Sequence, residues 1–374
     1  MTLQIQLKLN FSDGVTIENQ CPFFGEKSDY GVYLCISQYF DLARSAKQNM
    51  KRITVTILLL GILLLLGSGF NADKSDSLKI NNSTSQLKII YLGTAGWEIT
   101  DGKTVILVDP YLSRLRRSYS DSTDSVTTQD TEDTRKAFGP NDFVESDTVI
   151  INQHIKRADY ILVHHSHRDH IMDVPYIALK TGATVIGTES TANIMTAYGI
   201  PEEKIITVKG GEDYDFGTFS VKVIPSLHSP LYEKRYYDLR VIPKDIKVPL
   251  RVGDYVEGGS LNFLIRFNGH VIFTSGSMNY IENELRDLHP DVAIVGAAPS
   301  RHEIYDYAAR LMRVLNYPSI VLPTHWDNFS IPYNAPEGEQ LEQLKSFKQE
   351  IIKASPKTKV IVPKYFEPII LKTK

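Results

Sequence analysis

The stretch YILVHHSHRDH, residues 160–170, decides the fold because it joins a short apolar run to a dense group of metal-ligand side chains. The run has the length and composition of a buried strand, and a helical pattern begins directly after it. In an extended segment alternate side chains share a face, so His165, His167 and Asp169 can converge while His170 reaches a second position. Imidazoles with a carboxylate suit divalent ions such as zinc, iron or manganese. The sequence therefore predicts a metal site at this strand end.

Apolar runs of similar length recur on both sides of this stretch, with turn residues between them. They predict strands at 87–93, 104–109, 160–165, 183–188, 219–226, 261–267, 270–276, 292–297 and 319–325. Helical patterns lie near 171–180, 189–199, 279–288, 302–316 and 338–354. Because strands come in succession early and alternate with helices later, the order predicts an α/β protein with helices packed outside two sheets.

Four further polar residues stand where predicted strands end, and they are Asp109, His228, Ser277 and His325. Each of them alone is weak evidence for a site. Together with the cluster at 165–170 they complete a set of ligands and supporting groups.

With this set the chain resembles the metallo-β-lactamase superfamily, whose H-x-H-x-D-H motif matches residues 165–170. The stretches YLGTAGWEI (91–99), VDPYL (108–112) and PTHWDNF (323–329) are similar to the branch that includes L-ascorbate-6-phosphate lactonase-like proteins and N-acyl-phosphatidylethanolamine phospholipase D. The resemblance covers about residues 87–366. It implies an αββα sandwich with metals at the rim between the sheets.

The same resemblance implies one or two divalent ions, zinc first, with manganese and iron as alternatives. It assigns one ion to His165, His167 and His228, and the other to Asp169, His170 and His325. Where hydrolases of this branch usually carry a bridging Asp, this chain has Ser277. Two alternatives follow, namely a single ion or two ions joined only by hydroxide.

A bound divalent ion lowers the pKa of water toward about 7 and polarises a carbonyl or phosphoryl oxygen. Asp169 would be both ligand and proton acceptor, oriented by partners such as Asp109. This chemistry predicts a hydrolase of an ester, lactone or phosphodiester, with a small-molecule or phospholipid-type substrate. The alternatives are a β-lactam-type amide hydrolase and a non-catalytic metal-binding or sensing module that lost the bridging Asp at Ser277.

Four residues are candidates for contacts with the substrate. Arg301 follows a predicted strand and would bind an anionic group, and His302 would orient the substrate or donate a proton. Tyr236 lies in an aromatic and basic insertion at 229–259 that has the character of a lid. Trp326 would line a pocket. The competing interpretations are a solvated loop for the first three residues and a core position for Trp326.

The N-terminal region predicts export. Residues 53–70 carry no charge and follow Lys51 and Arg52, which is typical of a signal peptide or of a membrane anchor. Read in order, the chain has a leader at 1–49 that would lie upstream of a true start at Met50, a signal or anchor at 50–72, a linker at 73–86 and the hydrolase domain at 87–374. We expect the body to be membrane-anchored, periplasmic or extracellular.

Composition narrows the classes of function. The chain has 374 residues, 42% of them hydrophobic, which is ample for a sizeable core. Its net charge of -3 gives no cationic field, so binding of nucleic acid is not expected. A Ser/Thr/Asp-rich stretch at 113–135 predicts a mobile loop.

Overall fold

The computed structural model describes residues 4–10, 16–22, 86–118, 133–230, 233–236 and 238–372. The chain forms two compact units, Met1–Asn81 and Asn82–Lys374. In the first unit, β1 (Gln4–Asn10) and β2 (Thr16–Pro22) pair as an antiparallel hairpin. The predicted signal or anchor at 50–72 lies outside the described residues. Among the residues that are described, no helix is both long and apolar enough to cross a membrane.

The first of the two large sheets belongs to the second unit and has seven strands in the order β10-β9-β8-β5-β4-β3-β18. Strands β5, β8, β9 and β10 run parallel, and β18, β3, β4 and β5 pair antiparallel. Their bounds are β3 Leu87–Gly93, β4 Gly96–Thr100, β5 Val105–Val108, β8 Tyr160–Leu162, β9 Thr184–Gly187, β10 Ile205–Thr207 and β18 Pro368–Leu371.

The second sheet also has seven strands, in the order β11-β12-β13-β14-β15-β16-β17. The pairs from β11 to β14 are antiparallel and those from β14 to β17 are parallel. Their bounds are β11 Asp213–Asp215, β12 Phe219–Pro225, β13 Leu261–Phe267, β14 His270–Ser275, β15 Val292–Gly296, β16 Ile320–Thr324 and β17 Lys359–Val360. A short parallel pair, β6 (Arg116–Arg117) with β7 (Ala137–Phe138), lies outside both sheets.

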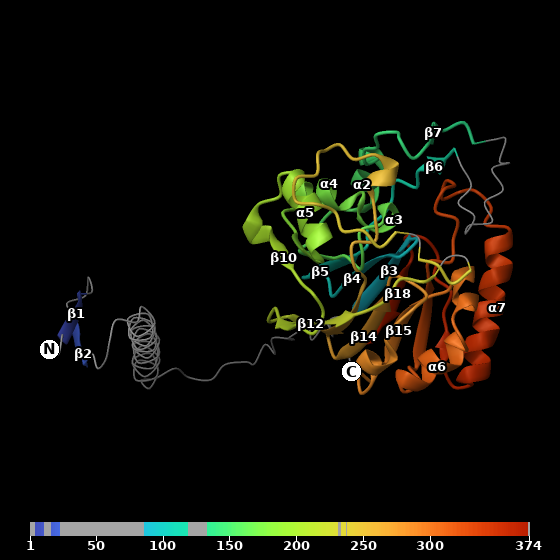
Figure 1. The fold of residues 1–374 in the computed structure, drawn as a ribbon. Helices are drawn as coiled ribbons and strands as arrows, with labels where there is room; N and C mark the ends of the chain where they lie inside the picture. The colour runs from blue at the N-terminus through green and yellow to red at the C-terminus, as the bar shows by residue number, and fades with distance from the viewer. Residues whose placement is uncertain are drawn as a thin grey trace, which may run out of the picture. The chain divides into compact units, whose positions relative to one another are not determined.

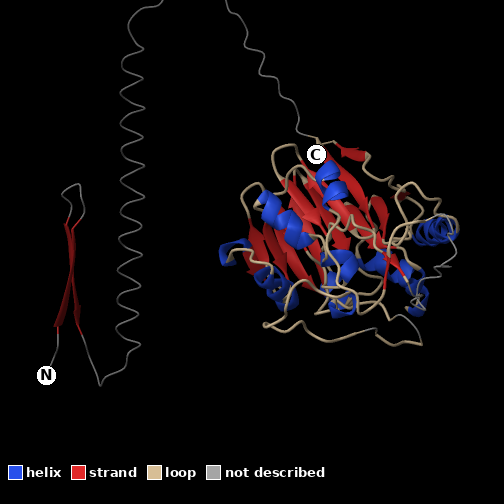
Figure 2. Cartoon of the chain, turned by 90° about the horizontal axis from the view of Figure 1, so that it is seen from above, coloured by secondary structure: helices blue, strands red, loops and turns tan. Residues whose placement is uncertain are grey.

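Helices cover the outer faces of the sheets (Figure 1). Those beside the first sheet are α2 (Thr148–His154), α3 (Arg168–Ile171), α4 (Val174–Thr181) and α5 (Glu189–Ala197), and those beside the second are α6 (Tyr307–Val314) and α7 (Glu339–Ala354). Seen from above, the strands lie between helices on both sides (Figure 2). The predicted α/β sandwich is therefore confirmed.

Two apolar clusters explain why the layers stay together. One joins the facing sides of the sheets with α6 and α7, through residues such as Ile106, Phe263 and Phe347. The other packs α2, α4 and α5 on the first sheet, through residues such as Leu107 and Ile177. Each fully buried aliphatic or aromatic side chain of this kind contributes about 1.5–3 kcal/mol of transfer free energy.

Some elements differ from the sequence prediction. The helix expected at 279–288 is only a 3-10 turn, η3 (Glu282–Leu285), and the one expected at 302–316 is split into η4 (Pro299–Glu303) and α6. Helix α2 was not predicted, although Asp147 caps it by accepting hydrogen bonds from Val149 N (3.0 Å) and Ile150 N (3.3 Å). The short helix gives too few residues for a clear periodic pattern.

Candidate metal centre

The ends of three strands deliver the predicted ligands to one place. The chain leaves β8 at Leu162 and reaches α3 at Arg168, so the histidines of the motif lie in the short connection and the first turn of that helix. His228 follows β12 of the second sheet, and His325 follows β16. Both sheets therefore contribute side chains to the same site.

The first cluster consists of His165, His167 and His228, which offer ligand atoms within 4.8 Å of one another. The distance between His165 Nε2 and His167 Nδ1 is 3.1 Å. Two nitrogens bound to one tetrahedral zinc at about 2.0–2.1 Å would be separated by about 3.3 Å, so the spacing fits a shared ion. His228 Nδ1 donates a hydrogen bond to Ser229 O (2.8 Å), which leaves the Nε2 lone pair for a metal.

These imidazoles are neutral at ordinary pH. Burial lowers the pKa of His165 and of His167 well below 6.5, and the neighbouring histidines lower it further. Burial also lowers the pKa of His228 to about 4. Neutral imidazole is the form that binds a metal ion, so burial keeps these three histidines in the metal-binding form.

The second cluster consists of Asp169, His170 and His325. Asp169 Oδ2 lies 3.5 Å from His170 Nε2 and 3.2 Å from His325 Nε2. Burial raises the pKa of Asp169, but the electrostatic attraction of His170 and the hydrogen bond from His325 outweigh this and hold the pKa well below its usual value. One carboxylate oxygen and two imidazole nitrogens thus face a common point, which also fits a divalent ion.

Asp109 fixes the orientation of His170 in the second cluster. Its Oδ2 accepts hydrogen bonds from His170 Nδ1 (2.5 Å) and His164 Nδ1 (2.6 Å), and its Oδ1 accepts from His164 N (2.9 Å). Burial raises the pKa of Asp109, yet the two imidazoles lower it to about 2. Because the carboxylate only accepts, the proton of His170 stays on Nδ1 and its Nε2 lone pair points to Asp169.

Ser277 lies beside the first cluster, where the resemblance placed a bridging Asp. Its hydroxyl accepts a hydrogen bond from Ser229 N (2.8 Å) and lies 3.2 Å from Ser229 Oγ. The carbonyl oxygen of Ser229 in turn accepts a hydrogen bond from His228 Nδ1. Ser277 therefore holds the backbone next to His228.

The prediction that Arg301 binds an anionic substrate group is wrong. Its side chain is 1% exposed, and Nη2 forms an ion pair with Glu350 of α7 at 2.8 Å while Nη1 donates to Ala297 O at 2.8 Å. The guanidinium fastens α7 to the end of β15 and is not available to a ligand. His302, the adjacent residue, is exposed and belongs to none of the three groups of potential metal ligands found among the described residues.

Two aromatic candidates have different environments. Tyr236 is 37% exposed, and its hydroxyl lies 3.5 Å from Asn279 Nδ2, which also donates to His228 O at 3.2 Å. This places Tyr236 one side chain away from the first cluster. Trp326 is buried and stacks on Tyr91 and Tyr365, with ring centroids 6.1 and 6.3 Å apart, as expected of a core position.

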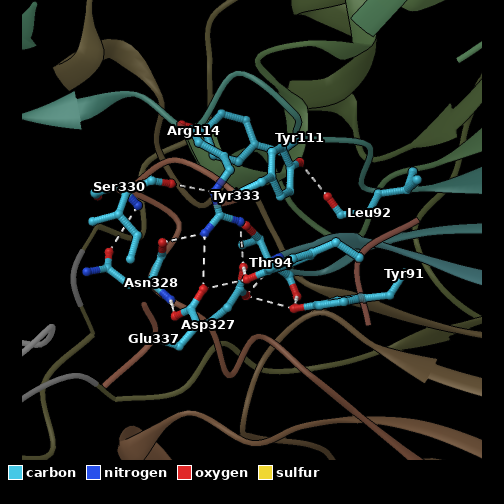
Figure 3. Close-up of polar contacts among 12 residues, drawn as sticks. Tyr91, Leu92, Thr94, Tyr111, Arg114, Asp327, Asn328, Ser330, Tyr333 and Glu337 are labelled. Carbon is cyan, nitrogen blue, oxygen red and sulfur yellow. Dashed lines mark hydrogen bonds and ion pairs between the residues drawn. The ribbon is translucent and has the colours of Figure 1, made fainter. Parts of the chain in front are cut away.

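A buried network around Asp327 was not predicted (Figure 3). Arg114 pairs with Asp327 at 2.6 Å, although residues 113–118 begin the stretch for which the sequence predicted a mobile loop. The described start of this stretch is thus ordered and largely buried, while 119–132 lies outside the described residues. The available signal was Asp327 inside PTHWDNF, two residues after a ligand candidate.

Comparisons with known proteins agree with this geometry. A family model described as a beta-lactamase superfamily domain matches residues 88–325. A UPF0173 metal-dependent hydrolase of Staphylococcus aureus is 29% identical over 190 residues, which cover 50% of this chain and 76% of that protein. Igni18, a metallo hydrolase of the archaeon Ignicoccus hospitalis, has a similar fold, with a TM-score of 0.50, 18% identity, and coverage of 77% of this chain and 100% of Igni18. Because the matched region runs from the first strand of the sandwich to His325, the chain belongs to the metallo-β-lactamase superfamily of metal-dependent hydrolases.

Proposed function

We propose that this hydrolase holds one divalent ion between His165, His167 and His228, and a second between Asp169, His170 and His325. The observation that carries the proposal is a pair of adjacent clusters, the first buried and the second partly buried, whose donor atoms lie within 4.8 Å of one another inside each cluster. Zinc suits three imidazoles best, and manganese or iron also suits the cluster that contains a carboxylate. When bound, such an ion supplies hydroxide at neutral pH and polarises the bond to be cleaved.

The protein groups have separate tasks in this proposal. Asp169 is close enough to both His170 and His325 to bind the second ion and to accept a proton from the attacking water. Asp109 keeps His170 in the tautomer that leaves Nε2 for the metal. Ser277 binds the backbone of Ser229, and Ser229 binds His228, so the serine at the position of the usual aspartate fixes the orientation of one ligand of the first ion.

We propose an ester, lactone or phosphodiester as the substrate, including a phospholipid-type one, as in the branch that the sequence resembles. Support comes from the insertion at 229–259, where Leu239 (66%) and Val241 (58%) are exposed apolar side chains on the same loop as Tyr236. A small-molecule lactone or β-lactam amide is the alternative. The charge-free segment 53–70 supports export, either with a cleaved signal or with a membrane anchor.

The first experiment measures metal content by elemental mass spectrometry on the purified full chain, beside His167→Ala and Asp169→Ala. We expect two ions per chain, and less metal with loss of hydrolysis in each variant. A panel of phosphodiester, lactone and β-lactam substrates then separates the candidate reactions. If the wild-type chain retains no metal and hydrolyses nothing on the panel, the non-catalytic module becomes the better account.

A further inference from the structure

The guanidinium of Arg114 binds the loop at 327–331 with all three nitrogens, and Nη2 also pairs with Glu337 at 3.6 Å. Nη1 binds Asp327 Oδ2 (2.6 Å), Nε donates to Ile331 O (2.7 Å), and Nη2 donates to Asn328 O (2.5 Å). The side chain is 1% exposed and lies over the ring of Tyr333, with 4.6 Å to the centroid (Figure 3). A buried charge in such a fork is fully satisfied, so the loop at 327–331 has one defined position relative to Arg114.

A glycine makes room for this guanidinium. A Cβ on Gly93 would lie 2.8 Å from Arg114 Nη1, and the φ of Gly93 is +97°, which side-chain-bearing residues rarely adopt. The end of β3 is therefore shaped to let the guanidinium approach the backbone.

The carboxylate of Asp327 connects the same loop to the turn after β3. Its Oδ1 accepts hydrogen bonds from Thr94 N (2.9 Å) and from the Tyr91 hydroxyl (2.7 Å), and its Oδ2 accepts from the Tyr365 hydroxyl (2.9 Å) as well as from Arg114. Asp327 thus has partners on both oxygens and joins segments that lie more than 200 residues apart in the chain.

The same turn holds the backbone of His325. Thr94 O accepts a hydrogen bond from His325 N (2.6 Å) and another from Thr324 Oγ1 (3.0 Å). His325 itself has a φ of +53°, a left-handed conformation that non-glycine residues rarely adopt and that persists only where the surroundings impose it. Thr94 is therefore bound through its N–H to Asp327 and through its carbonyl to His325.

We propose that Arg114 and Asp327 are positioning residues for His325, and that they hold its Nε2 toward Asp169 in the second cluster. This inference rests on the proposed function only in treating His325 as a metal ligand. The bonds from Arg114 fix the loop, Asp327 fixes Thr94, and Thr94 fixes the strained residue whose ring faces Asp169 at 3.2 Å. A network that acted only on global stability would have no particular effect on this one ligand.

The chain offers a control in Arg301, a second buried arginine, whose hydrogen bonds go to Glu350, Ala297, Ala298 and Gln343 and not to Asp327 or Thr94. Arg114→Met and Arg301→Met each remove a buried guanidinium; the first leaves Asp327 and Glu337 without it, and the second leaves Glu350. Both variants should lose stability, so their comparison separates a positioning role from a structural one.

The test combines metal titration with amide hydrogen exchange in the metal-free full chain. In Arg114→Met we expect the affinity for one of the two ions to fall about 10-fold or more, the lower bound for loss of groups that orient a metal ligand. We also expect faster exchange of the His325 amide. Arg301→Met should keep both affinities and the wild-type exchange at His325. If Arg114→Met fails to fold, Tyr365→Phe, which removes the hydroxyl that contacts both Asp327 and Glu337, should show the same changes with smaller size.

Equal metal affinity and equal His325 exchange in Arg114→Met and in the wild type would overturn the inference, as would identical changes in Arg301→Met. A wild-type chain that binds fewer than two ions would instead contradict the proposed second site. In that case the hydrogen exchange at His325 still decides whether Arg114 positions this residue.

Discussion

Replacing Asp109 with asparagine should weaken binding of the second ion and also lower the stability of the fold. In the wild type one carboxylate accepts three hydrogen bonds from His164 and His170 at 2.5–2.9 Å. An asparagine offers one acceptor and places its amide hydrogens against at least one buried N–H donor, at a cost of about 1–3 kcal/mol. The imidazoles also lower the pKa of Asp109 from 3.8 to about 2, which corresponds to about 2 kcal/mol of stability near neutral pH.

The two contributions predict that Asp109→Asn lowers the free energy of unfolding of the metal-free chain by about 3–5 kcal/mol, the range for a broken buried pair. They also predict about 10- to 100-fold weaker binding of the second ion, because His170 can now move its proton to Nε2. Urea unfolding and metal titration measure the two effects.

The matched control is Asp173→Asn. Asp173 is an equally buried carboxylate, but it accepts from Leu112 N (2.7 Å) and Ser113 N (2.9 Å) instead of from an imidazole. We expect it to lose stability with no change in metal affinity. Wild-type affinity for both ions in Asp109→Asn, or equal losses of affinity in both variants, would refute the role assigned to Asp109.

Three further predictions concern neighbouring groups. Burial lowers the pKa of His228 to about 4 in the folded chain, so the unfolded state binds more protons between pH 6.5 and 4. The free energy of unfolding of the metal-free chain should therefore fall by about 3 kcal/mol as the pH falls through that window. A His228→Gln variant should show a shallower dependence of the free energy of unfolding on pH. Gly276→Ala places a Cβ 2.5 Å from His164 Cβ and should cost about 1–3 kcal/mol in thermal or urea unfolding, whereas unchanged stability would mean that His164 can move aside. Ser277→Asp should disturb the contact with Ser229 N and weaken binding of the first ion in a metal titration, and a large gain in hydrolysis would instead show that the serine handicaps the site.

The sequence predicted those parts of the site that are local in the chain. The motif at 165–170 sits directly after a strand, so alternation along the backbone was enough to bring His165 and His167 together. Arg301 was misplaced because a residue after a strand turns either to the rim or to the outer layer, and the choice depends on where α7 packs. The pair of Arg114 and Asp327 was missed because its partners are 213 residues apart.

The strands that were predicted are likewise those that are evident from their own stretch of sequence. Strands rich in aromatic or β-branched residues, such as β13 and β14, follow from composition alone. Strand β4 was not predicted, because its five residues follow a tight turn at 94–95 and contain too few apolar residues in sequence. Its place in the first sheet depends on pairing with both β3 and β5, which is tertiary information.

The origin of the ligands in both sheets has a consequence for how the protein would assemble and come apart. His165, His167, Asp169 and His170 follow a strand of the first sheet, whereas His228 and His325 follow strands of the second. Neither sheet alone supplies all three ligands of the first or of the second cluster, so each ion would link the two sheets. Ion binding would then stabilise the closed sandwich in proportion to RT ln(1 + [L]/Kd), and removing the ions should loosen the two halves from each other before either half loses its own strands.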